Sequence, residues 1–226
     1  MSEKLDGIRA CVFDAYGTLF DVHSAVERLK DRVGPEATQV SEVWRVKQLE
    51  YTWLRALMGR HVDFWQVTSD ALDYALETFG VDDGTVRDAL LDAYKVLDAY
   101  PEVDDVLSRL KQRGLKTAIL SNGEPAMLQA AAGSAGIAGL LDHLLSVEEV
   151  GIYKPAPVVY QLAVDSLGVP PAAIAFQSSN PWDVHGAAAF GFRAVWINRR
   201  HLVPERLPGT PSAMLHDLRG LSDLID

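Results

Sequence analysis

Short apolar runs of strand length alternate along the chain with longer segments of helical periodicity. The first run covers residues 8–13 and stops at a carboxylate, Asp14. Four more runs follow at residues 117–120, 144–147, 173–176 and 193–197. A fully apolar run between turn residues is typical of a buried strand in a parallel sheet. Because helical segments separate the runs, the pattern predicts right-handed βαβ units and an α/β fold.

The segment after the first strand carries only helical patterns, as far as about residue 99. We expect helices at residues 24–33, 41–58, 64–79 and 85–97. A helical block inserted after the first strand of a parallel sheet predicts a cap over the strand ends. We therefore expect a core formed by residues 1–21 and 100–226, and a helical cap subdomain formed by residues 22–99.

The chain returns to the core at Pro101, which we expect at the first position of a helix that ends at Gly114. Further helices are expected at residues 125–135, 158–167 and around 187–190. The tail from residue 203 contains three prolines and a weakly amphipathic end.

Composition and charge narrow the possible partners. The chain has 226 residues, 48% hydrophobic content and a formal net charge of −10, so nucleic acid is an unfavourable partner. No apolar run reaches membrane-spanning length, and the N-terminus shows no signal-peptide pattern. The single cysteine, Cys11, excludes an internal disulfide and is expected to be a packing residue. These features predict a cytoplasmic protein that binds neither nucleic acid nor a membrane.

Polar residues follow the predicted strands and the loops between them. The four clusters are Asp14 with Thr18, Ser121 with Asn122, Lys154 alone, and Ser178 with Asn180 and Asp183. Ligands bind at the carboxyl ends of parallel strands, where an aspartate serves well as a nucleophile. Taken singly, each cluster is equally typical of a turn, a helix cap or a solvated loop. Their order along one sheet edge is what favours a site.

Together with the helical insert, these clusters resemble the haloacid dehalogenase (HAD) superfamily, and more narrowly the L-2-haloacid dehalogenases. The narrower resemblance rests on residues 13–19, 44–55 and 178–183. The second segment lies in the expected cap, where members of the superfamily diverge, so it is the most specific. The resemblance implies a Rossmann-like parallel sheet core flanked by helices, with an inserted α-helical cap subdomain.

The resemblance also implies a reaction. Asp14 would attack C2 of a short-chain L-2-haloalkanoic acid from the side opposite the halogen, forming an ester with inversion. Water would then attack the Asp14 carbonyl carbon and release a D-2-hydroxy acid. The expected substrate is a small 2-haloacid, and neither a cofactor nor a metal is expected.

Six further catalytic residues are implied by the resemblance. Thr18 would orient Asp14, and Lys154 would hold it ionised, because a nearby cation favours the carboxylate. Asp183, with Ser178 and Asn180, would position Lys154 and the hydrolytic water. Arg45 would face the leaving halide from the cap, although its position alone indicates an ordinary exposed helix arginine.

Substrate-binding residues are implied in the same way. Arg45 and Asn122 would bind the halide, and Ser121 the substrate carboxylate. The pocket wall around the alkyl group would be formed by Tyr16, Leu49, Phe64 and Trp182. Tyr160 also matches a family site position. For these aromatic residues, and for Tyr160, packing in the core is the competing interpretation.

Two other functions stay open. A HAD phosphatase usually carries a second aspartate two residues after the nucleophile, where this chain has Tyr16, a phenol with a pKa of about 10. A non-catalytic binding protein on the same fold is the other alternative. Val46 and Pro181 depart from the family pattern and put the substrate range in doubt. A homodimer is expected, and Trp53, Leu54 and Leu57 are candidates for its interface.

Overall fold

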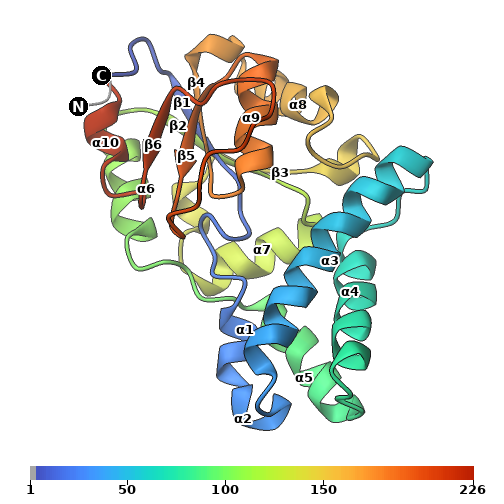
Figure 1. Ribbon diagram of the computed structural model, residues 1–226. Helices are drawn as coiled ribbons and strands as arrows, with labels where there is room; N and C mark the ends of the chain where they lie inside the picture. Colours follow the sequence, from blue (N-terminus) through green and yellow to red (C-terminus); the bar gives the residue numbers. More distant parts are fainter. Residues whose placement is uncertain (1–3) are drawn as a thin grey trace.

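A single parallel sheet forms the centre of the computed structural model, which describes residues 4–226 (Figure 1). Its six strands run in the order β3-β2-β1-β4-β5-β6. They are β1 (Ala10–Phe13), β2 (Lys116–Ser121), β3 (His143–Ser146), β4 (Ile174–Ser178), β5 (Arg193–Ile197) and β6 (Ala213–Leu215). All pairs are parallel, so the predicted α/β class with a parallel sheet is confirmed.

Helices cover both faces of this sheet. On one face α6 (Val103–Gln112) packs against α10 (Leu221–Leu224), and on the other α8 (Pro157–Leu167) packs against α9 (Pro181–Phe190) (Figure 1). Helix α7 (Pro125–Ser134) lies beside β3. With both faces covered, β1 is completely buried, which explains its uninterrupted apolar sequence.

The register of the sheet sets where Asp14 lies. Phe13 is paired with Ile119 on one side and with Gln177 on the other. The Asp14 amide still donates to the Gln177 carbonyl at 2.8 Å, so the carboxyl ends of β1, β2 and β4 meet at one edge. This is the edge at which open α/β sheets bind ligands.

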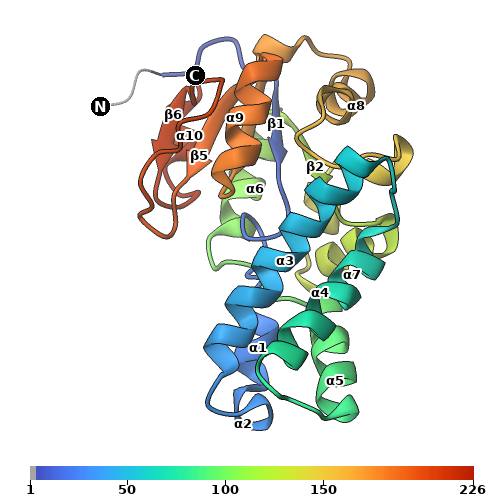
Figure 2. The ribbon, with the colours of Figure 1, turned by 45° about the vertical axis from the view of Figure 1, so that its right-hand side comes forward.

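Five helices occupy the segment expected to form the cap. They are α1 (Ser24–Arg28), α2 (Lys30–Val33), α3 (Ala37–Met58), α4 (Phe64–Thr78) and α5 (Gly84–Lys95). Helices α3 and α4 lie side by side in both views (Figures 1 and 2). The two ends of this helical segment lie side by side, and the Asp21 backbone N–H donates to the Asp98 carbonyl at 2.8 Å. The division into core and cap at these residues stays a prediction, and residues 1–3 lie outside the described part.

The predicted elements differ from the structure in several places. The helix expected at residues 24–33 is two short helices, separated at Leu29, whose backbone leaves the helical region. Pro101 precedes α6 instead of starting it, since Glu102 is the N-cap. The helix expected around residues 187–190 starts earlier, at Pro181. The tail adds β6, a three-residue edge strand too short and too exposed to show an apolar run.

Within residues 4–226, no helix combines the length and the apolar character needed to cross a bilayer.

Candidate active site

Asp14 lies at the end of β1 with its carboxylate held by three side chains. Oδ2 accepts hydrogen bonds from Thr18 Oγ1 at 3.0 Å and from Asn180 Nδ2 at 2.8 Å. Oδ1 is 3.2 Å from Lys154 Nζ. The residue is only 6% exposed, so a charge here depends on these donors more than on water. Three predicted residues therefore meet at the predicted nucleophile.

The turn after Asp14 places Thr18 against the loop that follows β4. Ser179 donates its backbone N–H to Thr18 Oγ1 at 2.8 Å, which leaves the hydroxyl proton free for Asp14. The turn requires Gly17, whose φ is +91°. A Cβ at this position would also lie only 3.0 Å from Ser179 Oγ.

A second buried carboxylate lies behind the first. Lys154 Nζ is 2.9 Å from Asp183 Oδ2, and Tyr160 donates its hydroxyl to Asp183 Oδ1 at 2.8 Å. Lys154 is 1% exposed and Asp183 is fully buried. The Tyr160 ring also packs edge-on against Phe176 in the core, and a role of Tyr160 in the reaction stays a prediction.

Burial and charge shift the pKa values of this group in opposite ways. Burial by itself lowers the pKa of Lys154, but the carboxylates of Asp183 and Asp14 outweigh it and the pKa is raised. Burial raises the pKa of Asp183 to about 6, against the opposing effect of the Lys154 ammonium. Lys154 is therefore a cation, and Asp183 titrates close to neutrality.

Arg45 reaches this group from the cap. Its Nη2 donates to the Tyr16 carbonyl at 3.1 Å and to Asn180 Oδ1 at 3.2 Å. Since a guanidinium can only donate, the Asn180 amide must present its oxygen to Arg45 and its nitrogen to Asp14. Arg45 is not the exposed helix arginine of the competing interpretation, because it is partly buried and bonded to the core.

The remaining polar residues support the loops around Asp14. Asn122 Oδ1 accepts from the Lys154 backbone N–H at 3.1 Å. Ser178 Oγ accepts from the Asn180 backbone N–H at 3.2 Å. Ser121 Oγ accepts from the Gly123 backbone N–H at 3.0 Å, so this hydrogen bond holds its own loop and does not reach Asp14.

The expected wall residues divide into two groups. Tyr16, two residues after Asp14 in the chain, packs against Phe64 with ring centroids 5.7 Å apart. Burial raises the pKa of Tyr16 well above its usual value, so the phenol is neutral. Trp182 instead packs edge-on against Trp53 of α3, at 5.3 Å and 80°. Trp182 thus contacts the cap from the core.

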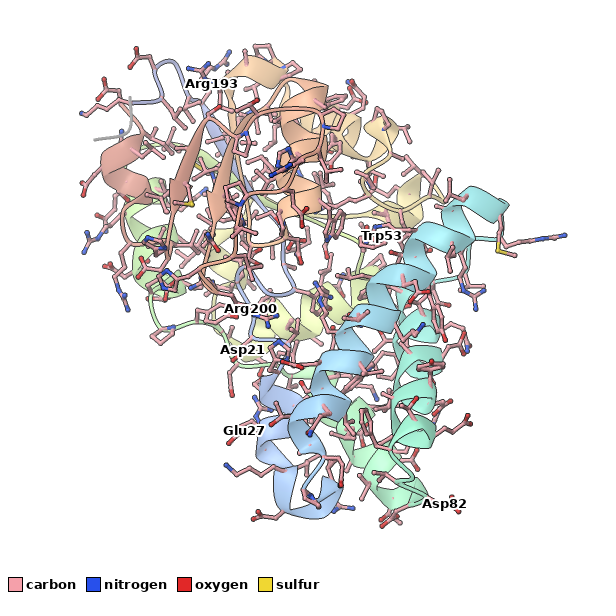
Figure 3. The ribbon with its side chains drawn as sticks, in the orientation of Figure 1. Asp21, Glu27, Trp53, Asp82, Arg193 and Arg200 are labelled. Carbon is pink, nitrogen blue, oxygen red and sulfur yellow. The ribbon has the colours of Figure 1, made fainter. Side chains whose placement is uncertain are left out.

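A cleft of about 1050 Å³ separates α1, α2 and α3 from the loops that follow β4 and β5. Arg45, Leu49 and Asn180 lie on its wall, and Asp14 is not among its lining residues. Three charged residues of the cleft, Asp21, Glu27 and Arg200, lie beside α3 on the side away from α4 (Figure 3). The cleft therefore reaches Arg45, one of the two predicted halide-binding residues.

Four residues that the sequence did not single out belong to this site: Gln48, Tyr94, Ser179 and Arg199. Arg199 follows β5, donates to the Thr18 carbonyl at 2.9 Å and pairs with Glu102 at 2.7 Å. The rule that polar residues follow strands also applies to Arg199, two residues after β5, and could have found it. Gln48 had a weaker signal, its spacing of three residues from Arg45 on one helix.

Comparisons with known proteins agree with this geometry. The family model described as haloacid dehalogenase-like hydrolase matches residues 8–191. The (S)-2-haloacid dehalogenase 1 of Pseudomonas sp. (strain CBS-3) is 50% identical, over 97% of this chain and 96% of its own. The crystal structure of a dehalogenase with an intermediate complex has a TM-score of 0.95 and 48% identity, covering 97% of this chain and 98% of its own.

A third relative was solved with a ligand attached. It is the L-2-haloacid dehalogenase of Xanthobacter autotrophicus with chloropropionic acid covalently bound, at a TM-score of 0.87 and 38% identity. It covers 96% of this chain and 98% of its own. Similarity of this extent and identity defines a family, so the chain belongs to the haloacid dehalogenase-like hydrolases and, within them, to the (S)-2-haloacid dehalogenases.

Proposed function

We propose that this protein is an (S)-2-haloacid dehalogenase that converts short-chain L-2-haloalkanoic acids into D-2-hydroxy acids with inversion at C2. The observation that carries this proposal is the Asp14 carboxylate, held by Thr18, Lys154 and Asn180 at the end of β1. A relative that is similar over 97% of this chain is named an (S)-2-haloacid dehalogenase. A covalently bound chloropropionic acid in one of them supports an ester intermediate.

In the first half-reaction, one Asp14 oxygen attacks C2 of the substrate. The new C–O bond forms as the carbon–halogen bond breaks, and the bonding electron pair leaves with the halide. Negative charge thus moves from Asp14 to the halide, on the side where Arg45 and Asn122 receive it. An arginine suits this position because it keeps its charge when partly desolvated. Ser121 and the backbone after Asp14 bind the substrate carboxylate.

In the second half-reaction, water attacks the carbonyl carbon of the Asp14 ester. Asp183 takes a proton from this water, and its pKa of about 6 suits a general base near neutral pH. The bond between the carbonyl carbon and the ester oxygen breaks, and the alkoxide takes the proton that Asp183 had received. The Asp14 carboxylic acid formed in this step then releases its proton to water and returns as a carboxylate. Lys154, between both carboxylates, stabilises the negative charge at each stage.

The test is chloride release from L- and D-2-chloropropionate, each with and without EDTA. We expect release from the L form only, with D-lactate as product and no effect of EDTA. Within residues 4–226 no cluster of three or more His, Cys, Asp or Glu side chains is arranged to hold a metal, but only the EDTA arm tests the metal-free mechanism. No release from either form would overturn the proposal and favour a phosphatase or a binding protein.

We also propose a homodimer in the cytoplasm. The C-terminal end of α3 exposes Leu57 (85%) and Leu54 (45%), beside Met58 (70%), which is costly for a surface without a partner. The buried, unpaired Cys11 fits a reducing compartment. Light scattering at micromolar concentration tests the dimer, and a monomer there would contradict it.

A further inference from the structure

Gln48 is a buried polar residue in the middle of the cap, 1% exposed and three positions after Arg45 on α3. Its Oε1 accepts a hydrogen bond from Arg45 Nη1 at 2.7 Å. Its Nε2 donates to Thr68 Oγ1 on α4 at 2.8 Å and to the Tyr94 hydroxyl at 3.0 Å. Burying an amide is costly unless all its polar atoms are hydrogen-bonded, and the partners of Gln48 satisfy both its oxygen and its nitrogen. These partners therefore indicate what Gln48 does in the cap.

The direction of this chain of hydrogen bonds is fixed at both ends. Thr68 spends its hydroxyl proton on the Phe64 carbonyl at 2.7 Å, so toward Gln48 it can only accept. Gln48 must therefore turn its nitrogen to Thr68, which leaves its oxygen for Arg45. A guanidinium can only donate, so it requires that oxygen. No flipped amide satisfies both neighbours.

A second connection joins the same residues to the nucleophile loop. The Tyr94 ring stacks on the Tyr16 ring, with centroids 5.6 Å apart and planes at 17°. The Tyr16 carbonyl in turn accepts from Arg45 Nη2 at 3.1 Å. Arg45, Gln48, Tyr94 and Tyr16 thus form a closed circuit between the cap and the loop after Asp14.

We propose that Gln48 is a positioning residue for the leaving group: it fixes the Arg45 guanidinium where the halide departs. A free arginine side chain has many rotamers, and ordering it lowers the entropic cost of halide binding. Gln48 acts through Arg45, since its side chain is hydrogen-bonded to Arg45, Thr68 and Tyr94. The inference rests on the proposed function, because it assumes that Arg45 receives a halide.

The experiment compares Gln48→Met with Thr52→Val. Methionine keeps the length of the side chain and removes both hydrogen-bonding groups. Thr52 is a matched control: it is fully buried on the same helix, one turn further on, and its hydroxyl bonds the Leu49 carbonyl at 2.6 Å. Halide affinity is measured from the rise in melting temperature with sodium bromide against sodium nitrate, which needs no turnover. Chloride inhibition, kcat and KM for L-2-chloropropionate are measured beside it.

We expect Gln48→Met to weaken halide binding by roughly tenfold, the usual effect of a lost hydrogen bond to a charged group. The value of kcat should fall while KM for the substrate changes less, because the halide develops its charge only in the transition state. Thr52→Val should keep the halide affinity of the wild type. Unchanged halide affinity in Gln48→Met, or an equal loss in Thr52→Val, would overturn the inference.

A second pair of variants covers the case in which Gln48→Met does not fold. Thr68→Val removes the acceptor that fixes the amide, whereas Thr68→Ser retains the hydroxyl, so only the first should weaken halide binding. Equal affinities in this pair would also contradict the inference. If the wild type turns over L-2-chloropropionate but Gln48→Met keeps the wild-type halide affinity, the inference alone is wrong and the proposed function stands. Absence of turnover by the wild type would instead count against the proposed function, and absence of any halide-specific stabilisation against both.

Discussion

The core half and the cap half of the site are built in different ways. In the core, Asp14, Lys154 and Asp183 are almost completely buried and hold one another through an ammonium between two carboxylates. From the cap, Arg45 is partly buried and donates hydrogen bonds to two core atoms, the Tyr16 carbonyl oxygen and Asn180 Oδ1. The bond-forming residues are thus fixed by the sheet, and the leaving-group residue by a helix.

This difference indicates which substitutions should destabilise the fold and which should impair only the reaction. Breaking a buried ion pair leaves an uncompensated charge inside the protein, which is strongly destabilising. Arg45 lies on the wall of a cleft, where a missing charge is replaced by water. We therefore expect core variants to lose stability and activity, except where shape and neighbours are kept, and cap variants to lose activity alone.

The largest expected effect is on turnover in Asp14→Asn. An amide keeps the shape of the carboxylate but is no nucleophile, so kcat should fall by at least about a thousandfold. Circular dichroism should show an intact fold, because Lys154 keeps Asp183 as a partner. Mass spectrometry is needed as a control against deamidation back to aspartate. Turnover near the wild-type value would remove Asp14 as the nucleophile.

Lys154→Met should give the largest loss of stability. It leaves two buried carboxylates without their cation, and we expect about 3–5 kcal/mol from urea unfolding, together with loss of turnover. Lys95→Met is the matched control, since Lys95 pairs with Asp92 at 2.9 Å on the surface of α5. An exposed pair of this kind contributes less than about 1 kcal/mol. Similar losses in both variants would contradict the contrast between buried and exposed pairs.

Arg45→Ala should separate activity from stability. Chloride release should fall by roughly a hundredfold, while the free energy of unfolding changes by only about 1 kcal/mol, the cost of leaving Gln48 Oε1 without a donor. Arg45→Lys should lie in between, because lysine keeps the charge but lacks the planar fork that reaches Gln48 and Asn180 together. A loss of stability as large as that of Lys154→Met would show that Arg45 is structural.

The predictable parts of the molecule are those that follow from short-range pattern. The strand ending at Asp14 and the polar residues after β2 and β4 were found because apolar runs and turns are local. The edge strand β6 was missed, since three residues with mixed exposure show no period. The break at Leu29 was missed because nothing in the sequence there excludes a continuous helix.

In the site, the roles implied by the family resemblance could be predicted, and those set by packing in this chain could not. Asp14 and Lys154 were expected together because the resemblance places them in one site, where a nearby cation favours the carboxylate. Gln48 was not, since a helix glutamine is ordinarily exposed, and only packing between α3 and α4 buries it. Likewise, the packing of Trp182 on Trp53 could not be predicted, because it depends on where the cap lies relative to the core.

The smallest expected effect is a pH dependence that belongs to the core half alone. Because the pKa of Asp183 is raised from 3.8 to about 6 in the folded protein, kcat, which includes the hydrolysis step that Asp183 serves, should halve near pH 6 and fall about tenfold per unit below it. Stability should move the other way. A raised pKa means that the folded state binds the proton more tightly, so this contribution is present below about pH 4 and is lost as the pH rises through 6.

The cap variant provides the decisive comparison for this pH dependence. Arg45→Lys lowers the rate at every pH but leaves Lys154 and Asp183 in place, so its acid limb should keep the same midpoint. A midpoint that moves with the Arg45 variant would mean that the cap shares the titrating group. In that case the two halves form one electrostatic unit, because a change in the cap then reaches a buried carboxylate of the core.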